Sequence, residues 1–350
     1  MFNFAENFDI MFSNSFIPDP NFNVLQNFYT QVLDQNESSP SFGKGALIII
    51  NRDSINSGIA NTLGSFCNHF KNISITFAGA LNNDQNLPIL ISELSKKSII
   101  PIFIGFDAES AGEIAAQMQV KLVQIANKIN NLTHPSFFIK SRYLGYQRHI
   151  CDLDDVMEIE NHHCNSMSLG KIRTYPAMTE PVLRDIQLLH LNLSVVRAAD
   201  CPSCGDALPT GLNAEELCQI MKYAGMANHL KAFFISTDNI SNQNNQSAVQ
   251  LLAESIWYFL EGINHQCKDH PKLSKDFSEF LIFSQELDID LTFIRHNQSH
   301  KWWLKYPNGA EFSYLAATYD EYQSCASDEI SDRVRKFIHE NEMAMSIAEQ

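Results

Sequence analysis

The sequence predicts an α/β fold: a doubly wound parallel sheet with helices on both faces, which is a three-layer αβα arrangement. Two observations lead to this prediction. Short apolar, β-branched runs recur along the chain, and "ALIIIN" at residues 46–51 is typical of a strand covered on both faces. Helical patterns separate these runs, and alternating strands and helices favour a parallel sheet. In such a sheet, ligands bind beyond the carboxyl ends of the strands.

The individual elements follow in chain order from their local patterns. The apolar runs predict strands at residues 46–51, 74–79, 99–106, 120–127, 136–142, 186–196 and 231–237. Helical spacing of leucine and isoleucine predicts a helix at 87–97, and an alanine-rich pattern predicts one at 109–119. An Asn-x-x-Glu capping box begins a helix at 213–230, and a broad apolar stripe predicts a helix at 246–266.

The chain divides into three predicted parts. Residues 1–44 form an N-terminal segment, residues 45–267 form the α/β domain, and residues 268–350 form a C-terminal extension. Within the extension, residues 287–307 predict two antiparallel strands joined by "HNQSH", and a pair of helices follows. The extension is too small for a core of its own, so we expect it to dock on the main sheet.

Two adjacent tryptophans, Trp302 and Trp303, stand in the predicted hairpin. We interpret them most simply as anchors for the docking of the extension. An exposed aromatic pair that binds a partner is the alternative. The sequence does not decide between packing within the chain and packing against another protein.

Composition bounds the class of protein. The chain has 350 residues, of which 45% are hydrophobic and 19% charged, as expected of a soluble globular protein. No run of 18 apolar residues predicts a transmembrane helix. The N-terminus lacks the pattern of a signal peptide, so we expect a cytoplasmic location. The net charge of −15 argues against nucleic-acid binding and gives no hint of an anionic-membrane surface.

Eight cysteines in a chain of this kind are expected to be free, mostly buried thiols. One pair, "CPSC" at Cys201 and Cys204, lies downstream of His162, His163 and Cys164. These residue types can bind zinc, but no second close Cys/His pair occurs at a zinc-finger spacing. We therefore expect a loop with two thiols rather than a metal site. A thioredoxin-type role is less favoured still, because no helix start lies between the two cysteines.

The common catalytic motifs are absent from the sequence. No G-x-G-x-x-G follows a strand, and no P-loop, G-x-S-x-G or H-E-x-x-H motif occurs. What remains is the row of predicted strand ends. One of these ends is unusual, because "LLHLNLSVV" places the polar residues His190, Asn192 and Ser194 on one face of an apolar strand.

Several long stretches resemble the ureohydrolase superfamily, which comprises arginase, agmatinase and formimidoylglutamase. "PVLRDIQLLHLNLSVVRAADCP" resembles the family segment that leads into a metal-binding strand, and "GLNAEELCQIMKYAGM" resembles the helix after it. "QSAVQLLAESIWYFLEGI" resembles the last core helix, and "KWWLKYP" with "YDEYQSCASDEISDR" resembles the tail of a divergent branch found in Bacteroidetes. The resemblance covers nearly the whole chain and implies the arginase type of αβα fold.

The resemblance also implies where metal ligands would stand. Active members hold two Mn²⁺ ions with carboxylates and two imidazoles, and the bound hydroxide attacks a guanidinium or formimino carbon. The first family motif is Gly-Gly-Asp-His. Here "IGFDA" keeps Gly105 and Asp107, while Phe106 replaces a glycine and Ala108 replaces the ligand histidine.

The remaining motifs are also changed. In the Asp-Ala-His-x-Asp motif, Ala126, Lys128 and Asn130 replace the three ligands. In the Ser-x-Asp-x-Asp motif, Asn192 and Ser194 replace both aspartates, and the late glutamate falls near Ser236. Alanine cannot coordinate a metal, and neutral amides and hydroxyls do not offset the charge of two divalent ions. The vacated positions are thus Ala108, Ala126, Lys128, Asn130, Asn192 and Ser194.

The side chain of Lys128 has two alternative positions. It either fills the former metal cavity, with Asp107 or Asp200 as a partner that keeps it charged, or it extends to solvent at a strand end. The polar groups available to such a pocket are Asp107, Lys128, His190, Asp200 and Ser236.

Three functions stay open. The first is a metal-free ureohydrolase-fold pseudoenzyme that acts as a scaffold or interaction protein and uses no cofactor. The second is a Mn²⁺-dependent hydrolase of C–N bonds in linear amidines, which would need a displaced metal site built from Asp107, His190, Asp200 and Cys201. The third is a small-molecule binder that uses Lys128 and Arg197, although an ordinary ion pair is the simpler role for Arg197. The protein partner is unidentified, and a homo-oligomer is possible.

Overall fold

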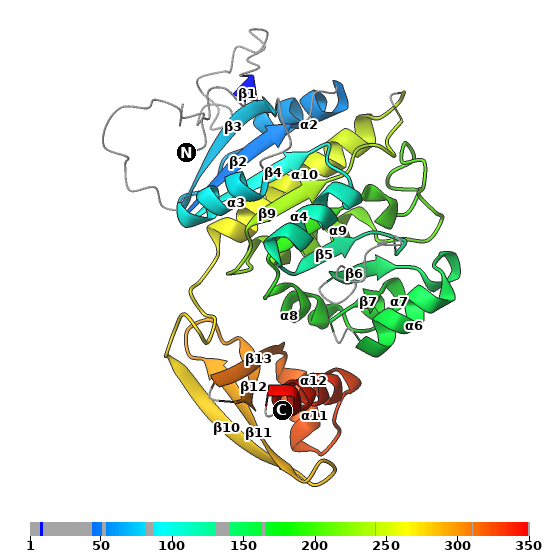
Figure 1. Ribbon diagram of the computed structural model, residues 1–350. Coiled ribbons are helices and arrows are strands. Elements are labelled where there is room, and N and C mark those ends of the chain that lie inside the picture. Colours follow the sequence, from blue (N-terminus) through cyan, green and yellow to red (C-terminus); the bar gives the residue numbers. More distant parts are fainter. Residues whose placement is uncertain are drawn as a thin grey trace, which may run out of the picture.

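The structure is a computed structural model that describes residues 8–9, 44–50, 54–81, 87–129, 141–162, 165–241, 243–309 and 311–348 (Figure 1). The predicted N-terminal segment and the first part of the strand predicted at 136–142 therefore lie largely outside the described residues, as do Asn130, His163 and Cys164. In the described part, no helix is long and apolar enough to cross a membrane.

The main sheet has nine strands in the order β1-β3-β2-β4-β9-β8-β5-β6-β7. Eight of them are parallel, and the two-residue strand β1 pairs antiparallel with β3. The strands are β1 (Phe8–Asp9), β2 (Lys44–Ile50), β3 (Ile73–Leu81), β4 (Ile99–Ile104), β5 (Leu122–Ile125), β6 (Ser141–Tyr146), β7 (Met167–Ser168), β8 (Leu188–Leu191) and β9 (Ala232–Ile235). The predicted doubly wound parallel sheet is confirmed.

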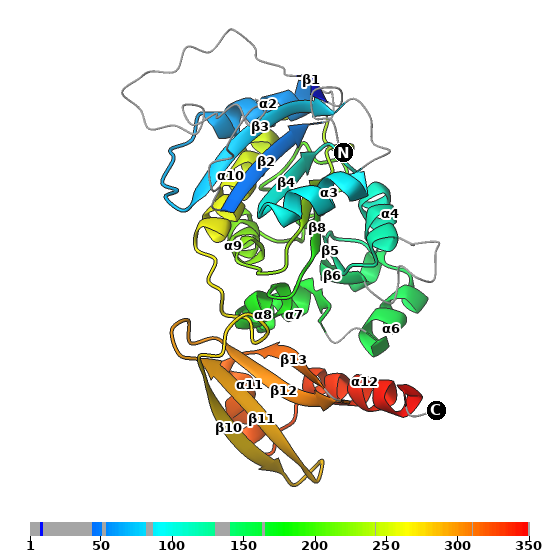
Figure 2. The same cartoon turned by 60° about the vertical axis from the view of Figure 1, so that its left-hand side comes forward.

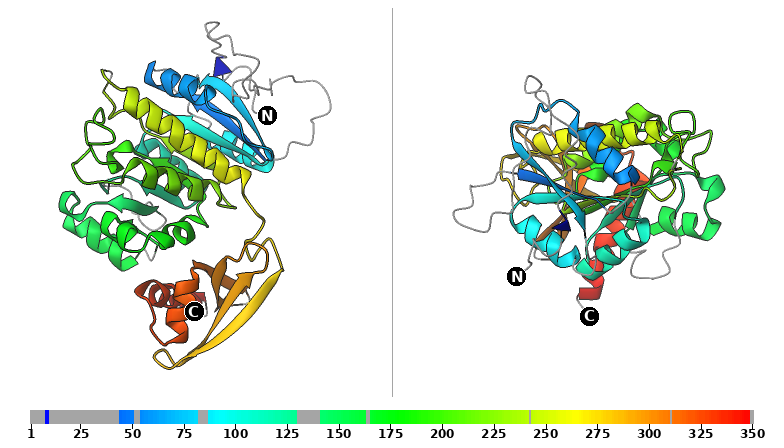
Figure 3. Two further views of the ribbon diagram at one scale, coloured as in Figure 1. Left: turned by 180° about the vertical axis from the view of Figure 1, so that it is seen from behind. Right: turned by 90° about the horizontal axis from the view of Figure 1, so that it is seen from above.

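Helices cover both faces of this sheet, as Figure 3 shows. One face packs against α2 (Ser54–Gly64), α9 (Ala214–Gly225) and α10 (Gln246–Asn264). The other face packs against α3 (Leu87–Lys96) and α4 (Ala108–Met118). Successive residues of a strand go to opposite layers: Ile48 lies in the first core and Ile49 in the second. The continuous apolar runs of the sequence follow from this burial on both faces.

Shorter helical elements surround the last strands of the sheet. They are η2 (Arg148–Ile150), α6 (Leu153–His162), α7 (Leu169–Thr174), η3 (Pro176–Met178), α8 (Thr179–Leu183) and η4 (Leu193–Val195). The strand predicted at 186–196 is shorter than expected for this reason. After Leu191, the Asn192 side chain accepts a hydrogen bond from the Ser194 N–H at 2.8 Å, and the chain turns into η4.

The C-terminal extension contains a second, antiparallel sheet in the order β10-β11-β12-β13. Its strands are β10 (Phe277–Ser284), β11 (Ile289–His296), β12 (Trp302–Asn308) and β13 (Glu311–Ala317), and two helices follow, α11 (Tyr319–Ala326) and α12 (Asp332–Ala348). The predicted hairpin corresponds to β11 and β12. The expectation that the extension lacks a core is wrong, because four strands and two helices enclose a buried cluster that includes Phe293, Leu304 and Val334.

The extension docks beside α8, as Figures 1 and 2 show. Trp303 is completely buried, and the guanidinium of Arg184 lies over its ring at 4.7 Å. Trp302 stacks on Tyr322 of α11 at 4.6 Å between ring centroids, and its carbonyl oxygen accepts a hydrogen bond from Arg184 Nη1 at 2.6 Å. Both tryptophans therefore pack within the chain, and the alternative of an exposed aromatic pair is wrong.

Candidate functional site

The predicted site lies where β4, β5, β8 and β9 end, and a buried histidine stands at its centre. His190 is the third residue of β8 and is completely buried. Its Nε2 lies 2.7 Å from the Ser236 hydroxyl, which follows β9 and lies 3.5 Å from the Phe106 carbonyl oxygen. Burial lowers the pKa of His190 to about 4, although the charge of Asp107 opposes this shift. The imidazole is thus neutral near pH 7.

The Ser236–His190 pair does not form a nucleophile and base. Ser236 is 2% exposed, so its hydroxyl is closed to a substrate. The second ring nitrogen, His190 Nδ1, is buried and has no hydrogen-bond partner. A catalytic base of this type needs a third group that orients it. The pair is therefore a hydrogen bond in the interior of the domain.

Two further polar residues continue a row across the sheet from His190, and neither was predicted from the sequence. Gln124 of β5 is the register partner of His190, and Tyr143 of β6 is the register partner of Gln124. Both Gln124 side-chain polar atoms and the Tyr143 hydroxyl are buried without a hydrogen-bond partner. We call His190, Gln124 and Tyr143 the polar row. Its signal in the sequence was a lone glutamine inside the apolar strand "LVQI".

Asn192 links two loops rather than a metal ion. Its Oδ1 accepts hydrogen bonds from the Ser194 N–H and from Asn239 Nδ2, both at 2.8 Å. Asn239 Nδ2 also lies 3.1 Å from the Cys204 sulfur, and Cys204 is a buried free thiol, as is Cys201. The amide at position 192 thus joins the loop after β8 to the loop after β9.

The charged residues of the predicted pocket have other roles. Asp107 caps α4, where its Oδ1 accepts a hydrogen bond from the Ser110 N–H at 2.8 Å. Asp200 accepts hydrogen bonds from Arg197 Nε and from the Ala214 N–H, each at 3.0 Å. The ion-pair interpretation of Arg197 agrees with this geometry.

Lys128 is exposed, so the interpretation that it fills a cavity is wrong. It extends to solvent just beyond β5, and this is the simpler of its two predicted roles.

The residues at this edge do not fit two manganese ions. Ala108 and Ala126 are buried and have no donor atom, Ser194 is neutral, and the Asn192 oxygen already accepts two hydrogen bonds. Two of the carboxylates in these loops, Asp107 and Asp200, accept hydrogen bonds from the first N–H groups of helices. Hard divalent ions need several anionic oxygens in one place. The displaced site expected from Asp107, His190, Asp200 and Cys201 does not occur as a ligand group in the described part of the chain.

A different group of three side chains has ligand spacing in the described residues. Asp185, His229 and His270 place one ligand atom each within 4.8 Å of one another. Asp185 lies three residues before β8, and His229 lies three residues before β9. The group therefore lies at the amino ends of the strands, opposite the edge where the resemblance puts metal ions. The sequence motifs did not reveal this group, because its three residues are far apart in the sequence.

The protonation of this group follows from its contacts. His270 Nδ1 accepts a hydrogen bond from the Lys272 N–H at 3.1 Å, so the proton of neutral His270 is on Nε2, which lies 3.4 Å from Asp185 Oδ1. Burial raises the pKa of Asp185, but His270, Arg142 and Lys121 outweigh it and hold that pKa below its usual value. A metal at Nε2 would displace this proton, so the group as arranged is an aspartate–histidine pair.

Burial lowers the pKa of His229, and the neighbouring His270 lowers it further. The two rings meet edge to face with centroids 4.5 Å apart. His229 is therefore neutral near pH 7, and His270 is the ring that contacts the carboxylate.

The sheet order, the parallel strands and the two helical layers define an arginase-type α/β fold. No family model matches the sequence, and no curated protein matches it. Solved structures do match. A Mn²⁺-bound variant of formiminoglutamase from Trypanosoma cruzi superposes with a TM-score of 0.58 at 12% identity, over 70% of this chain and 99% of the other.

Two more solved structures agree with this. Formimidoylglutamase from Bacillus subtilis gives a TM-score of 0.55 at 13% identity, over 73% of this chain and 97% of the other. An arginase superfamily protein from Trypanosoma cruzi gives 0.54 at 11% identity, over 70% and 99%. Identities this low show a shared fold. The arginase type of fold, expected from the sequence resemblance, is thus confirmed.

Proposed function

We propose that this chain is a metal-free pseudoenzyme with an arginase-type fold, which acts by binding as a scaffold or interaction protein. The main support comes from the side chains at and near the positions where the resemblance puts metal ligands, because they make contacts within the protein. Asn192 ties two loops together, Asp107 caps a helix, and His190 is neutral and bonded to Ser236. These three side chains, which could otherwise offer a metal an oxygen or nitrogen atom, thus serve the protein's own structure.

We also propose that the chain belongs to the divergent Bacteroidetes branch, because its tail sequence resembles that branch. We propose a cytoplasmic location as well. The seven cysteines of the described residues are all free thiols, which is usual in a reducing compartment. The net charge of −15 argues against a nucleic acid as the partner.

Metal content tests the proposal. Protein purified without chelators should hold less than about a tenth of an equivalent of manganese, and added Mn²⁺ should not raise its Tm. Asp185→Asn is the matched variant, because it removes the carboxylate at the opposite edge. Metal that survives this change and comes with hydrolysis of formimidoylglutamate, arginine or agmatine would establish the alternative, a Mn²⁺-dependent hydrolase of linear amidines.

A second candidate function is the binding of a small polar molecule. The polar row favours it, because buried polar groups without hydrogen bonds are costly and a ligand would satisfy them. Its three residues are at most 1% exposed, so binding requires this edge of the sheet to open. Lys128 and Arg197 do not support it, since one is exposed and the other is paired with Asp200. Small amides and carboxylates should then raise the Tm, and Gln124→Met should remove that rise. No rise with any of them would exclude this function for the compounds tested.

A further inference from the structure

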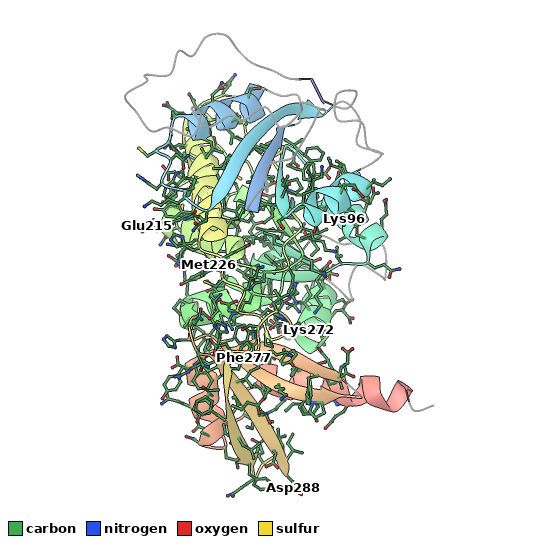
Figure 4. All side chains as sticks on the ribbon, turned by 90° about the vertical axis from the view of Figure 1, so that its left-hand side faces the viewer. Lys96, Glu215, Met226, Lys272, Phe277 and Asp288 are labelled. Atoms are coloured by element: carbon green, nitrogen blue, oxygen red, sulfur yellow. The ribbon has the colours of Figure 1, made fainter. Side chains whose placement is uncertain are left out.

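Strand β10 is an edge strand of the C-terminal sheet, and within the described residues no other strand pairs with its outer side. All eight of its residues pair with β11 without a shift in register. In Figure 4, it runs from Phe277, at the junction with the α/β domain, to the distal turn that contains Asp288. Eight residues give a straight edge of about 27 Å.

The backbone pattern identifies which groups of β10 are free. The Asn297 N–H donates to the Asp276 carbonyl oxygen at 3.1 Å, so residues 276 and 297 form a hydrogen-bonded pair. Such pairs alternate along an antiparallel ladder. The backbone groups of Glu279, Leu281 and Phe283 therefore point away from β11. A row of this kind is a template for another strand.

The side chains of the same residues leave this edge unprotected. Leu281 is 70% exposed and Phe283 is 57% exposed. Edge strands are usually guarded by charges or proline. The one charged residue in β10 is Glu279, and its carboxylate lies 2.9 Å from Lys305 Nζ of β12. The charge that would repel another strand is thus neutralised within the same sheet.

We propose that β10 is a homodimer interface, in which two copies of this chain pair antiparallel through β10 about a twofold axis at Leu281. In this register, Leu281 meets its own counterpart and Glu279 faces Phe283 of the second copy, so no like charges oppose each other. Three pairs of outward-facing residues form about six hydrogen bonds. The two sheets become one continuous sheet. This inference does not depend on the proposed function.

Mass in solution tests the interface. Light scattering of the full chain should give twice its mass of 39.7 kDa. Leu281→Lys should give a monomer, since two ammonium groups then meet at the axis, with at least a tenfold rise in the dimer Kd. Leu153→Lys is the matched control: Leu153 is 65% exposed on α6 and far from β10, so this variant should stay dimeric. Circular-dichroism spectra that match the spectrum of the unmodified chain would show that both variants are folded.

The salt dependence of the dimer and a disulfide cross-link at position 281 test how the two copies associate. Each copy carries a net charge of −15, so added NaCl should strengthen the dimer by screening the repulsion between copies. Leu281→Cys should form a disulfide-linked dimer on mild oxidation, because residues opposite each other in such a pair suit a disulfide. The unmodified chain, with its exposed Cys67 and Cys267, is the control for this step.

Several results would overturn the proposal. A monomer at about 100 µM would do so, because such a chain has no dimer of useful affinity. A dimer that Leu281→Lys leaves intact would place the interface elsewhere. Failure of Leu281→Cys to form any cross-link beyond that of the unmodified chain would exclude the register centred on Leu281.

Discussion

At the scale of single residues, the polar alternation on β8 has a structural explanation. The sequence marked His190, Asn192 and Ser194 as unusual. His190 and Asn192 join the segments that end β8 and β9, while the Ser194 N–H donates locally to Asn192. Residue types alone were enough to find these positions. They were not enough to place Lys128, whose exposure depends on where the strand ends.

His190 makes the fold sensitive to mild acid. Its pKa is about 4 in the folded protein, against an ordinary histidine value of 6.5, so the unfolded chain binds an extra proton between these pH values. The free energy of unfolding should be unaffected above pH 6.5 and should fall by about 3 kcal/mol as the pH drops to 4. Denaturant unfolding of the wild type and of His190→Gln measures this, and the variant should lose that part of the slope.

A direct control is available without substitution. The NMR titration of the His190 ring in the folded protein should show no protonation above about pH 5. A midpoint near 6.5 would contradict the buried, neutral state inferred from the structure. The lowered pKa of Asp185 affects stability in a different window, because its contribution is lost only below the usual carboxyl range.

At the scale of helices and strands, most of the α/β domain was predictable because its elements are strongly periodic. The helices at 87–97, 109–119, 213–230 and 246–266 occur within a few residues of their predicted bounds. Strands β10 and β13 were missed because their exposed faces carry apolar residues, which hides the alternation of a half-buried strand. The polar row was missed because it depends on how β5, β6 and β8 align with one another, and no single segment of the sequence specifies that alignment.

The contact between α9 and α10 depends on two glycines. A Cβ on Gly225 would lie 2.1 Å from the Phe259 carbonyl oxygen, and a Cβ on Gly262 would lie 2.2 Å from that of Lys222. Gly225→Ala should therefore push the two helices apart and cost about 3 kcal/mol of stability. Gly58→Ala is the control, because its nearest neighbour is an ordinary contact at 3.8 Å.

Thermal unfolding of the two variants separates packing from helix propensity. Alanine favours a helix over glycine by about 1 kcal/mol, so Gly58→Ala in α2 should be neutral or stabilising. Equal Tm changes in both variants would contradict the close helix contact.

At the scale of the whole molecule, one buried arginine joins the extension to the α/β domain. Arg184, at the end of α8, pairs with Glu180 and donates to the carbonyl oxygens of Trp302 and Ala317 at 2.6 and 3.4 Å. Lys301 adds to this junction, because its Nζ lies 3.6 Å from the Glu180 carboxylate of α8. The sequence could not reveal this arrangement, because residues more than a hundred positions apart supply it.

Arg184→Lys should loosen the junction while keeping the charge. Lysine is a point charge and cannot reach Glu180 and two carbonyl oxygens at once, so buried acceptors lose their partner. We expect a loss of about 2 to 4 kcal/mol. Arg148→Lys is the control, because its guanidinium is exposed and lies 3.6 Å from Glu160. Hydrogen exchange locates the effect: amides of β12 and β13 should exchange faster while those of β4 and β9 stay protected. Faster exchange throughout the molecule would mean that Arg184 supports the α/β domain itself rather than its contact with the extension.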